Sequence, residues 1–221
     1  MDASSSIFMA GAENPDLMRS GATTLLQALR GTASVASVIS FRNNAVTELP
    51  PTDLEGPAGF RRAVQSVEGI EFDEGTFGDP GAGTNWEAAF RAARLRGGGG
   101  RGAVDLAVIV TDGNPNRYGR PVDDVPSPES VDFDPRALDA GVAEANALRR
   151  AGTRVVAVGV GDVRAPSLQA VSGPTEGEDW FVGDFAAVAG SVGRVAATVC
   201  GTRCWSRPAS TTLRWPAWRS A

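Results

Sequence analysis

An almost unbroken run of apolar residues at 104–110 limits the fold of this chain more than any other feature of its sequence. A strand with one face in water alternates apolar and polar residues, whereas a strand buried on both faces does not. This run and a second one at 154–161 therefore predict two interior strands of a parallel sheet. Parallel neighbours need long crossover connections, which are usually helices, so the runs also predict helices between the strands.

The rest of the chain fits that alternation. Short β-branched segments predict strands, and apolar residues spaced three and four apart predict amphipathic helices. We expect further strands at 35–41, 45–49 and 180–182, the second of them stopped by Pro50-Pro51, and helices at 16–31, 57–67, 84–97, 135–151, 166–171 and 185–199. Asp134 is the expected N-cap of the helix at 135–151, with Pro135 at its first position, and residues 7–10 are expected to form a connecting segment. The alternation predicts an α/β fold with an open, doubly wound and mostly parallel sheet flanked by helices.

Length and composition indicate a single domain. A chain of 221 residues with 42% hydrophobic residues is enough for one core and short for two. The last 21 residues contain no acidic side chain and hold three of the five tryptophans, without periodicity. We therefore expect the domain to cover residues 1–200, with residues 201–221 as a tail or linker.

Several functions are excluded by what the sequence lacks. The chain has no histidine, which removes Ser-His-Asp and Cys-His catalysis and histidine zinc sites. Its basic residues are all arginines, scattered among 26 acidic residues, which argues against nucleic-acid binding. Cys200 and Cys204 alone make a poor zinc site. No apolar run reaches the length of a membrane span, and residues 1–20 do not have the form of a signal peptide.

Three short segments carry the chemistry that remains. Asp2, Ser4 and Ser6 form an Asp-x-Ser-x-Ser pattern, Thr84 follows a glycine-rich stretch at the start of a predicted helix, and Asp112 ends the apolar run on a loop that we expect to face solvent. Carboxylate and hydroxyl oxygens are hard donors that suit Mg²⁺, Mn²⁺ or Ca²⁺. Separately, these segments are a polar terminus, a helix cap and a turn, but their order favours a metal site.

The beginning of the sequence is abrupt for such a site. An Asp-x-Ser-x-Ser loop at the carboxyl edge of a sheet needs a strand before it, and only Met1 precedes Asp2. We expect the true start to lie upstream, or the chain to be a fragment of a longer protein. The first central strand of the sheet is then missing from this sequence.

The chain resembles the von Willebrand factor A (vWA) domain in the order and spacing of four segments: residues 2–6, Thr84, residues 108–113 and residues 156–161. The resemblance implies a Rossmann-like sheet with a metal-ion-dependent adhesion site (MIDAS). By this resemblance, Ser4, Ser6 and Thr84 are hydroxyl ligands, and Asp2 and Asp112 hold the metal directly or through water. The open coordination position then takes an Asp or Glu carboxylate of a protein partner. Ser5 stands where the family often has glycine.

The resemblance implies a non-catalytic, metal-dependent protein-binding module for adhesion or assembly. A bacterial, secreted or cell-surface parent protein fits Cys200, while a cytoplasmic location stays open. One alternative is a cytosolic vWA partner of an ATPase. Another is a Mg²⁺-dependent hydrolase or phosphotransferase with Asp2 as nucleophile, but that chemistry calls for a second acid at position 4 and a lysine.

Overall fold

The computed structural model describes residues 1–72, 83–97, 104–119 and 133–200. Most of the glycine-rich acidic segment before Gly83, most of the loop after Asp112 and the tail from residue 201 lie outside the described residues. The helices are α1 (Ser5–Ala10), α2 (Asn14–Leu29), α3 (Pro57–Glu68), α4 (Trp86–Gly97), α5 (Pro135–Arg150), α6 (Ala165–Ser172), the 3-10 helix η2 (Phe185–Ala187) and α7 (Val188–Cys200). The strands are β1 (Val35–Phe41), β2 (Ala45–Asp53), β3 (Leu106–Thr111), β4 (Arg154–Val160) and β5 (Trp180–Gly183).

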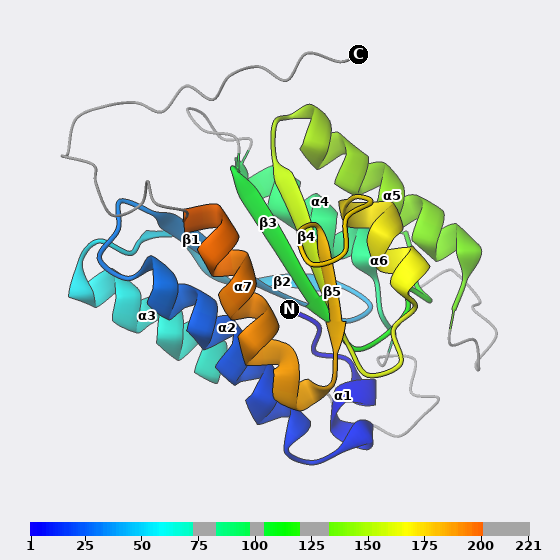
Figure 1. Cartoon of the computed structure of the whole chain (residues 1–221), viewed down its shortest axis with the longest axis horizontal. Coiled ribbons are helices and arrows are strands. Elements are labelled where there is room, and N and C mark those ends of the chain that lie inside the picture. Colours follow the sequence, from blue (N-terminus) through cyan, green and yellow to red (C-terminus); the bar gives the residue numbers. More distant parts are fainter. Residues whose placement is uncertain (73–82, 98–103, 120–132, 201–221) are drawn as a thin grey trace.

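The strands form two ladders that the first three residues connect. β1 and β2 make an antiparallel hairpin, and β3, β4 and β5 pair in that order and in parallel. Asp2 forms a parallel bridge with Phe41 of β1, and its N–H donates to the carbonyl of Val110 in β3 at 2.8 Å. Figure 1 accordingly places the N-terminus between the hairpin and β3. The spatial order is β2, β1, residues 1–3, β3, β4, β5.

Helices cover both faces of these strands, as the alternation predicts. α2, α3 and α7 form one layer, and α4, α5 and α6 form the other (Figure 1). The first layer packs closely, since a Cβ added at Gly21 of α2 would come within 3.2 Å of Val188 of α7. The second layer buries Trp86 and Phe90 of α4 against the sheet. Within the described residues, no helix is both long and apolar enough to span a bilayer.

The predicted end of the second strand is wrong. β2 does not stop at Pro50-Pro51 but continues to Asp53. The ladder is irregular at this point, because Val38 pairs with Leu49 while Ala36 pairs with Thr52. Proline is tolerated at a bulge of an edge strand, where its missing N–H leaves no ladder bond unmade.

Two helix starts also differ from prediction. Residues 7–10, expected as a connecting segment, belong to α1, which begins at Ser5 inside the predicted metal loop. Thr84 does not open α4. The helix begins at Trp86, and the side-chain oxygen of Asn85 accepts a hydrogen bond from the N–H of Ala88 at 2.9 Å, which is the bond of an N-cap.

Only part of β3 is buried as predicted. β4 is buried from its second residue onward, but in β3 burial begins at Ile109, and residues 106–108 are partly exposed. β1 follows the same trend, from Val35, which is 66% exposed, to the buried Phe41. The two strands that flank residues 1–3 are therefore covered only at their carboxyl ends.

Asp134 caps the N-terminus of α5. The Asp134 carboxylate accepts a hydrogen bond from the N–H of Arg136 at 2.8 Å, as the sequence predicts for an N-cap, and it also pairs with the Arg136 guanidinium. That guanidinium holds the pKa of Asp134 below its usual range. We expect Asp134→Ala to lower the free energy of unfolding by about 1 kcal/mol in urea titrations at pH 7.

The pH dependence of stability shows how much of the Asp134 contribution comes from its negative charge. A carboxyl whose pKa is lowered by folding stabilises the protein above its unfolded pKa of about 3.9, and this contribution is lost as the pH falls through the folded pKa. The difference between wild type and Asp134→Ala should therefore shrink below pH 4. Asp134→Asn is the matched control, because asparagine also caps helices; a loss in Asp134→Asn as large as in Asp134→Ala would contradict the capping role.

Candidate metal centre

The structure brings the five predicted ligands together where residues 1–3 meet the carboxyl ends of β1 and β3. Asp2 is the middle one of residues 1–3, Ser4 and Ser6 lie at the start of α1, Thr84 precedes α4, and Asp112 follows β3. The Oγ atoms of Ser4 and Ser6 are 3.0 Å apart. The Ser6 hydroxyl donates to Oδ1 of Asp112 at 3.0 Å, and the Thr84 hydroxyl lies 3.5 Å from Oγ of Ser4.

The cluster is almost closed to solvent. Asp2 and Ser4 are fully buried, Thr84 is 3% exposed and Asp112 is 8% exposed. The prediction that Asp112 faces solvent is therefore wrong. Ser6 is the member that remains partly exposed. The approach to the cluster is therefore on the side of Ser6.

Two carboxyl groups share this buried space, and burial makes the ionised form of each unfavourable. Burial, and then the nearby charge of Asp2, raise the pKa of Asp112 to about 8. Burial also raises the pKa of Asp2, although hydrogen bonds from Thr111 and Ser4 oppose the shift. A buried charge is stable only when it is paired or holds a metal. The N-terminal ammonium of Met1 favours the ionised form of Asp2. A divalent cation would favour the ionised form of both carboxyls.

The donor set fits such a cation. Two carboxylates and three hydroxyls are hard oxygen donors, the kind preferred by Mg²⁺, Mn²⁺ and Ca²⁺. The described part of the chain has no group of three or more acidic or cysteine side chains that could hold a metal. Because three of the five donors here are neutral, an ion held by them would keep more positive charge than in an all-carboxylate site.

Sequence reasoning missed two residues that hold the candidate ligands in place. The Thr111 hydroxyl donates to Oδ2 of Asp2 at 2.5 Å, which holds the end of β3 against residues 1–3. Oδ1 of Asn116 accepts from the N–H of Thr84 at 2.8 Å, and the N–H of Asn116 donates to the Thr84 carbonyl at 3.1 Å. The available signal was polar sequence after the predicted interior strand, since Thr111 directly follows that strand and Asn116 lies in the loop after it.

Two further asparagines, Asn43 and Asn85, hold residues 83–85 in place. Oδ1 of Asn43, in the β1–β2 turn, accepts from the N–H of Gly83 at 2.9 Å, and the Asn85 amide donates to the Asn43 carbonyl at 2.8 Å. The backbone approaches closely here, since a Cβ added at Gly83 would lie 2.3 Å from Oδ1 of Asn43. At Gly113 an added Cβ would lie 3.0 Å from Oγ1 of Thr84, so this glycine leaves room for the hydroxyl.

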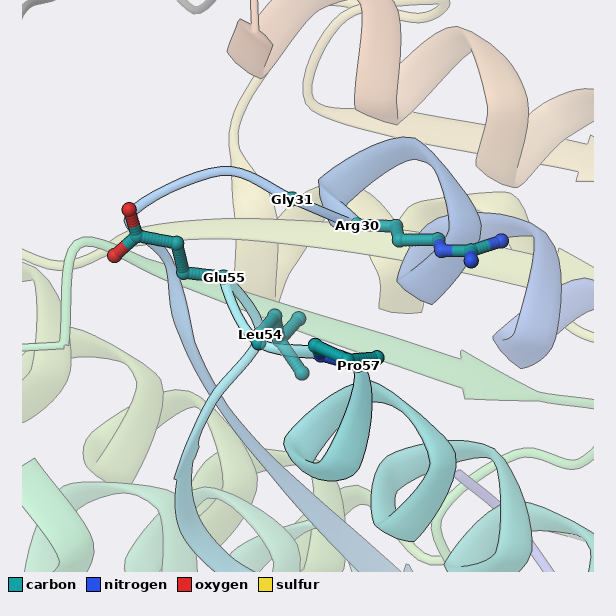
Figure 2. Close-up of a pocket in the computed structure, with 6 residues that line it drawn as sticks. Arg30, Gly31, Leu54, Glu55 and Pro57 are labelled. Atoms are coloured by element: carbon teal, nitrogen blue, oxygen red, sulfur yellow. The ribbon is translucent and has the colours of Figure 1, made fainter.

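A pocket elsewhere shares no residue with the cluster. It has a volume of about 160 Å³ and lies between the end of α2 and the start of α3. Figure 2 shows its lining, in which the charged ends of Arg30 and Glu55 point in opposite directions. The register of the hairpin pairs Val35 with Asp53 next to this pocket and Phe41 with Ala45 at the other end. The pocket and the candidate metal centre are therefore at opposite ends of the β1–β2 hairpin.

Three solved structures show the same fold. The proximal thread matrix protein 1 of the mussel byssus, in a structure with a zinc-occupied MIDAS motif, gives a TM-score of 0.66 at 18% identity over 90% of this chain and 46% of that chain. The vWF domain of the type V pili tip protein Mfa5 from Porphyromonas gingivalis gives 0.64 at 12% identity, over 95% of each chain. The manganese-loaded TRAP protein of Plasmodium vivax gives 0.55 at 16% identity, over 88% of this chain and 70% of that chain.

These three similarities concern the fold and not the function. The chain spans less than half the length of the mussel protein, and at these identities the structures establish the fold alone. No curated protein sequence matches this chain. The von Willebrand factor type A domain model, however, matches residues 1–192, which is most of the sequence. The chain therefore belongs to the von Willebrand factor type A domain family.

Proposed function

We propose that this chain is a non-catalytic protein-binding module whose binding depends on a divalent cation held by Asp2, Ser4, Ser6, Thr84 and Asp112. The observation that carries the proposal is the buried pair of carboxylates beside three hydroxyls, with the pKa of Asp112 raised to about 8 by burial and by Asp2. The metal-occupied structures of the mussel and Plasmodium relatives support a divalent ion at this edge of the fold.

Each side of the cluster has a separate task in this proposal. Asp112 and the hydroxyls contact the ion. Thr111 and the Ser4 N–H orient the Asp2 carboxylate through bonds of 2.5 and 3.0 Å. When bound, the ion supplies a positive centre that attracts an oxygen ligand from outside. The partly exposed side at Ser6 leaves room for that ligand.

The ligand that fits this opening best is a carboxylate of a partner protein. An Asp or Glu side chain forms a strong charge-assisted contact with a metal that has mostly neutral ligands. The matrix and pilus relatives support an adhesive or assembly role and a secreted or surface location. A peptide with one glutamate should bind the immobilised chain in Mg²⁺ or Mn²⁺, whereas its glutamine counterpart should not.

Thermal unfolding tests whether the site takes metal. We expect the melting temperature in millimolar Mg²⁺, Mn²⁺ or Ca²⁺ to exceed that in EDTA, because a ligand of the native state stabilises it by mass action. An ion at about a hundred times its dissociation constant contributes about 2.7 kcal/mol. For a chain of this size each kcal/mol is worth about 2–4 °C, so a shift of several degrees is expected.

The same experiment needs a variant that separates the site from general ion effects. Asp139 is an exposed acid on α5 and is not one of the proposed ligands, so Asp139→Asn should keep the full shift. Zn²⁺ belongs among the ions tested, given the zinc-occupied relative. A wild-type melting temperature that is the same in EDTA and in every ion would exclude the proposed metal dependence.

A further inference from the structure

Glu87 is a buried carboxylate in the first turn of α4, with 8% of its surface exposed. Its two oxygens have different partners. Oε2 accepts a hydrogen bond from the backbone N–H of Gly119 at 2.7 Å, and Oε1 pairs with the guanidinium of Arg91, one turn further along the helix. One oxygen of Glu87 therefore binds its own helix, and the other holds the backbone of a distant loop.

Arg91 belongs to a chain of ion pairs between α4 and α5, two helices that lie side by side (Figure 1). Its Nε donates to Oε1 of Glu144 at 3.2 Å, and Nε of Arg94 donates to Oε2 of the same carboxylate at 2.8 Å. Because Glu144 also holds Arg91, the guanidinium stays beside Glu87 and compensates its buried charge. The position of Glu87 is thus fixed from the side of α5.

Gly119 lies in the loop that follows the candidate ligand Asp112. Three residues before Gly119, Asn116 forms two hydrogen bonds with Thr84, one through its side chain and one through its N–H. The loop therefore bonds to residue 84 through residue 116 and to residue 87 through residue 119. The two contacts are three residues apart on both segments, so together they fix one register between the loop and the start of α4.

This register determines the shape of the candidate metal centre. Asp112 and Thr84 reach the cluster from the two segments that the contacts join, so the separation of their oxygens depends on how the loop lies against α4. A single contact at Asn116 leaves the loop free to pivot, and a second contact at Glu87 removes that freedom. Mg²⁺ requires near-ideal ligand geometry, so a small displacement of one oxygen lowers its affinity.

We propose that Glu87 is a positioning residue of the metal centre: through the N–H of Gly119 it holds the loop so that the Asp112 carboxylate and the Thr84 hydroxyl face the same ion. Glu87 itself does not contact the ion. The inference rests on the proposed metal-dependent function and adds to it a residue outside the ligand set.

Two matched variants of the full chain test this role. Glu87→Met and Glu144→Met each remove one carboxylate partner of Arg91, and methionine keeps the length and the helix propensity of the side chain. Glu144 bonds to the side chains of Arg91 and Arg94, whereas Glu87 also bonds to the loop. Both variants should lose stability, but only Glu87→Met should release Gly119.

Isothermal titration with Mg²⁺ and Mn²⁺ is the first readout. We expect Glu87→Met to weaken the affinity about tenfold, at the lower end of the range for residues that support metal ligands, and Glu144→Met to change it by less than about twofold. Glu87→Gln should recover most of the affinity. Its amide oxygen can still accept the hydrogen bond from Gly119, and Arg91 keeps Glu144 as a partner.

Amide hydrogen exchange in EDTA is the second readout, and it does not need a bound ion. In Glu87→Met, the N–H groups of Thr84 and Asn116 should exchange about tenfold faster relative to that of Val156, because local opening is separate from global unfolding. Val156 is fully buried in β4 and reports global stability. In Glu144→Met the same ratio should stay at its wild-type value.

Two results of the titration would overturn the proposal: equal losses of affinity in Glu87→Met and Glu144→Met, or a Glu87→Gln variant that binds as weakly as Glu87→Met. Either one would assign the effect to lost charge or stability. A wild-type chain that binds no ion refutes the proposed function instead. The exchange ratio then decides about Glu87 alone, since an unchanged ratio in Glu87→Met refutes its hold on the loop and an increase in that variant only supports it.

Discussion

Asp112→Asn is expected to weaken divalent-metal affinity by more than about a hundredfold and to abolish metal-dependent partner binding. Mutation of residues that merely support metal ligands typically costs 10–100-fold, and Asp112 is one of only two anions in the cluster. Asparagine has nearly the same shape and can still accept the hydrogen bond from Ser6 that Asp112 accepts at 3.0 Å. Isothermal titration with Mg²⁺ and Mn²⁺ measures the loss.

The same substitution should not harm the metal-free fold. In EDTA, wild type holds two carboxyl groups in a buried space, and burial, then the nearby charge of Asp2, raise the pKa of Asp112 to about 8. Asparagine replaces a carboxyl whose ionised form is disfavoured in this buried space, so the free energy of unfolding in EDTA should stay equal or rise. Asp139→Asn should change neither quantity. Unchanged metal affinity in Asp112→Asn would refute the assignment of Asp112 as a ligand.

Trp86→Ala is expected to lower the free energy of unfolding by about 3–5 kcal/mol, which is the usual cost of deleting a buried tryptophan side chain. Trp86 is fully buried at the start of α4, in a cluster with Phe41, Phe90 and Leu148. The neighbouring helix cannot easily fill the space, since Gly141 of α5 already lies against the Trp86 side chain. Urea unfolding followed by circular dichroism measures the change.

Trp86→Phe is the control for volume alone. Within the described part of the chain, the indole Nε1 of Trp86 is buried without a hydrogen-bond partner. Phenylalanine removes this unsatisfied donor and keeps most of the apolar contact, so it should cost far less than alanine. If phenylalanine proved as costly as alanine, an unseen hydrogen bond of the indole rather than the cavity would be the main contribution of Trp86.

Trp86 also connects stability to the metal centre. It directly follows Thr84 and Asn85, the segment that Asn43 and Asn116 hold by hydrogen bonds. A cavity at Trp86 can shift this segment, so the metal affinity of folded Trp86→Ala measures how far the packing of α4 positions the Thr84 hydroxyl. Trp86→Phe should keep that affinity close to the wild-type value.

The sequence by itself determined the elements that depend on local pattern. The apolar run at 154–161 predicted the buried strand β4, and Asp134-Pro135 predicted the capped start of α5. Periodicity, caps and strand runs are short-range properties, which is why these predictions are confirmed. The membership of the family followed from short motifs in order, and the family model over residues 1–192 confirms it. The assignment of the five residues as metal ligands stays a prediction.

Only the tertiary structure decided which groups meet. Residues 2 and 111 are far apart in the sequence, and the bond of 2.5 Å between the Thr111 hydroxyl and Asp2 exists because β3 ends beside residues 1–3. The burial of Asp112 has the same origin, since a loop pattern does not report what packs over it. The partial exposure of residues 106–108 is a further case. Their apolar pattern predicts burial on both faces, but burial also requires a neighbouring strand, and pairing between distant segments is fixed only by the assembled sheet.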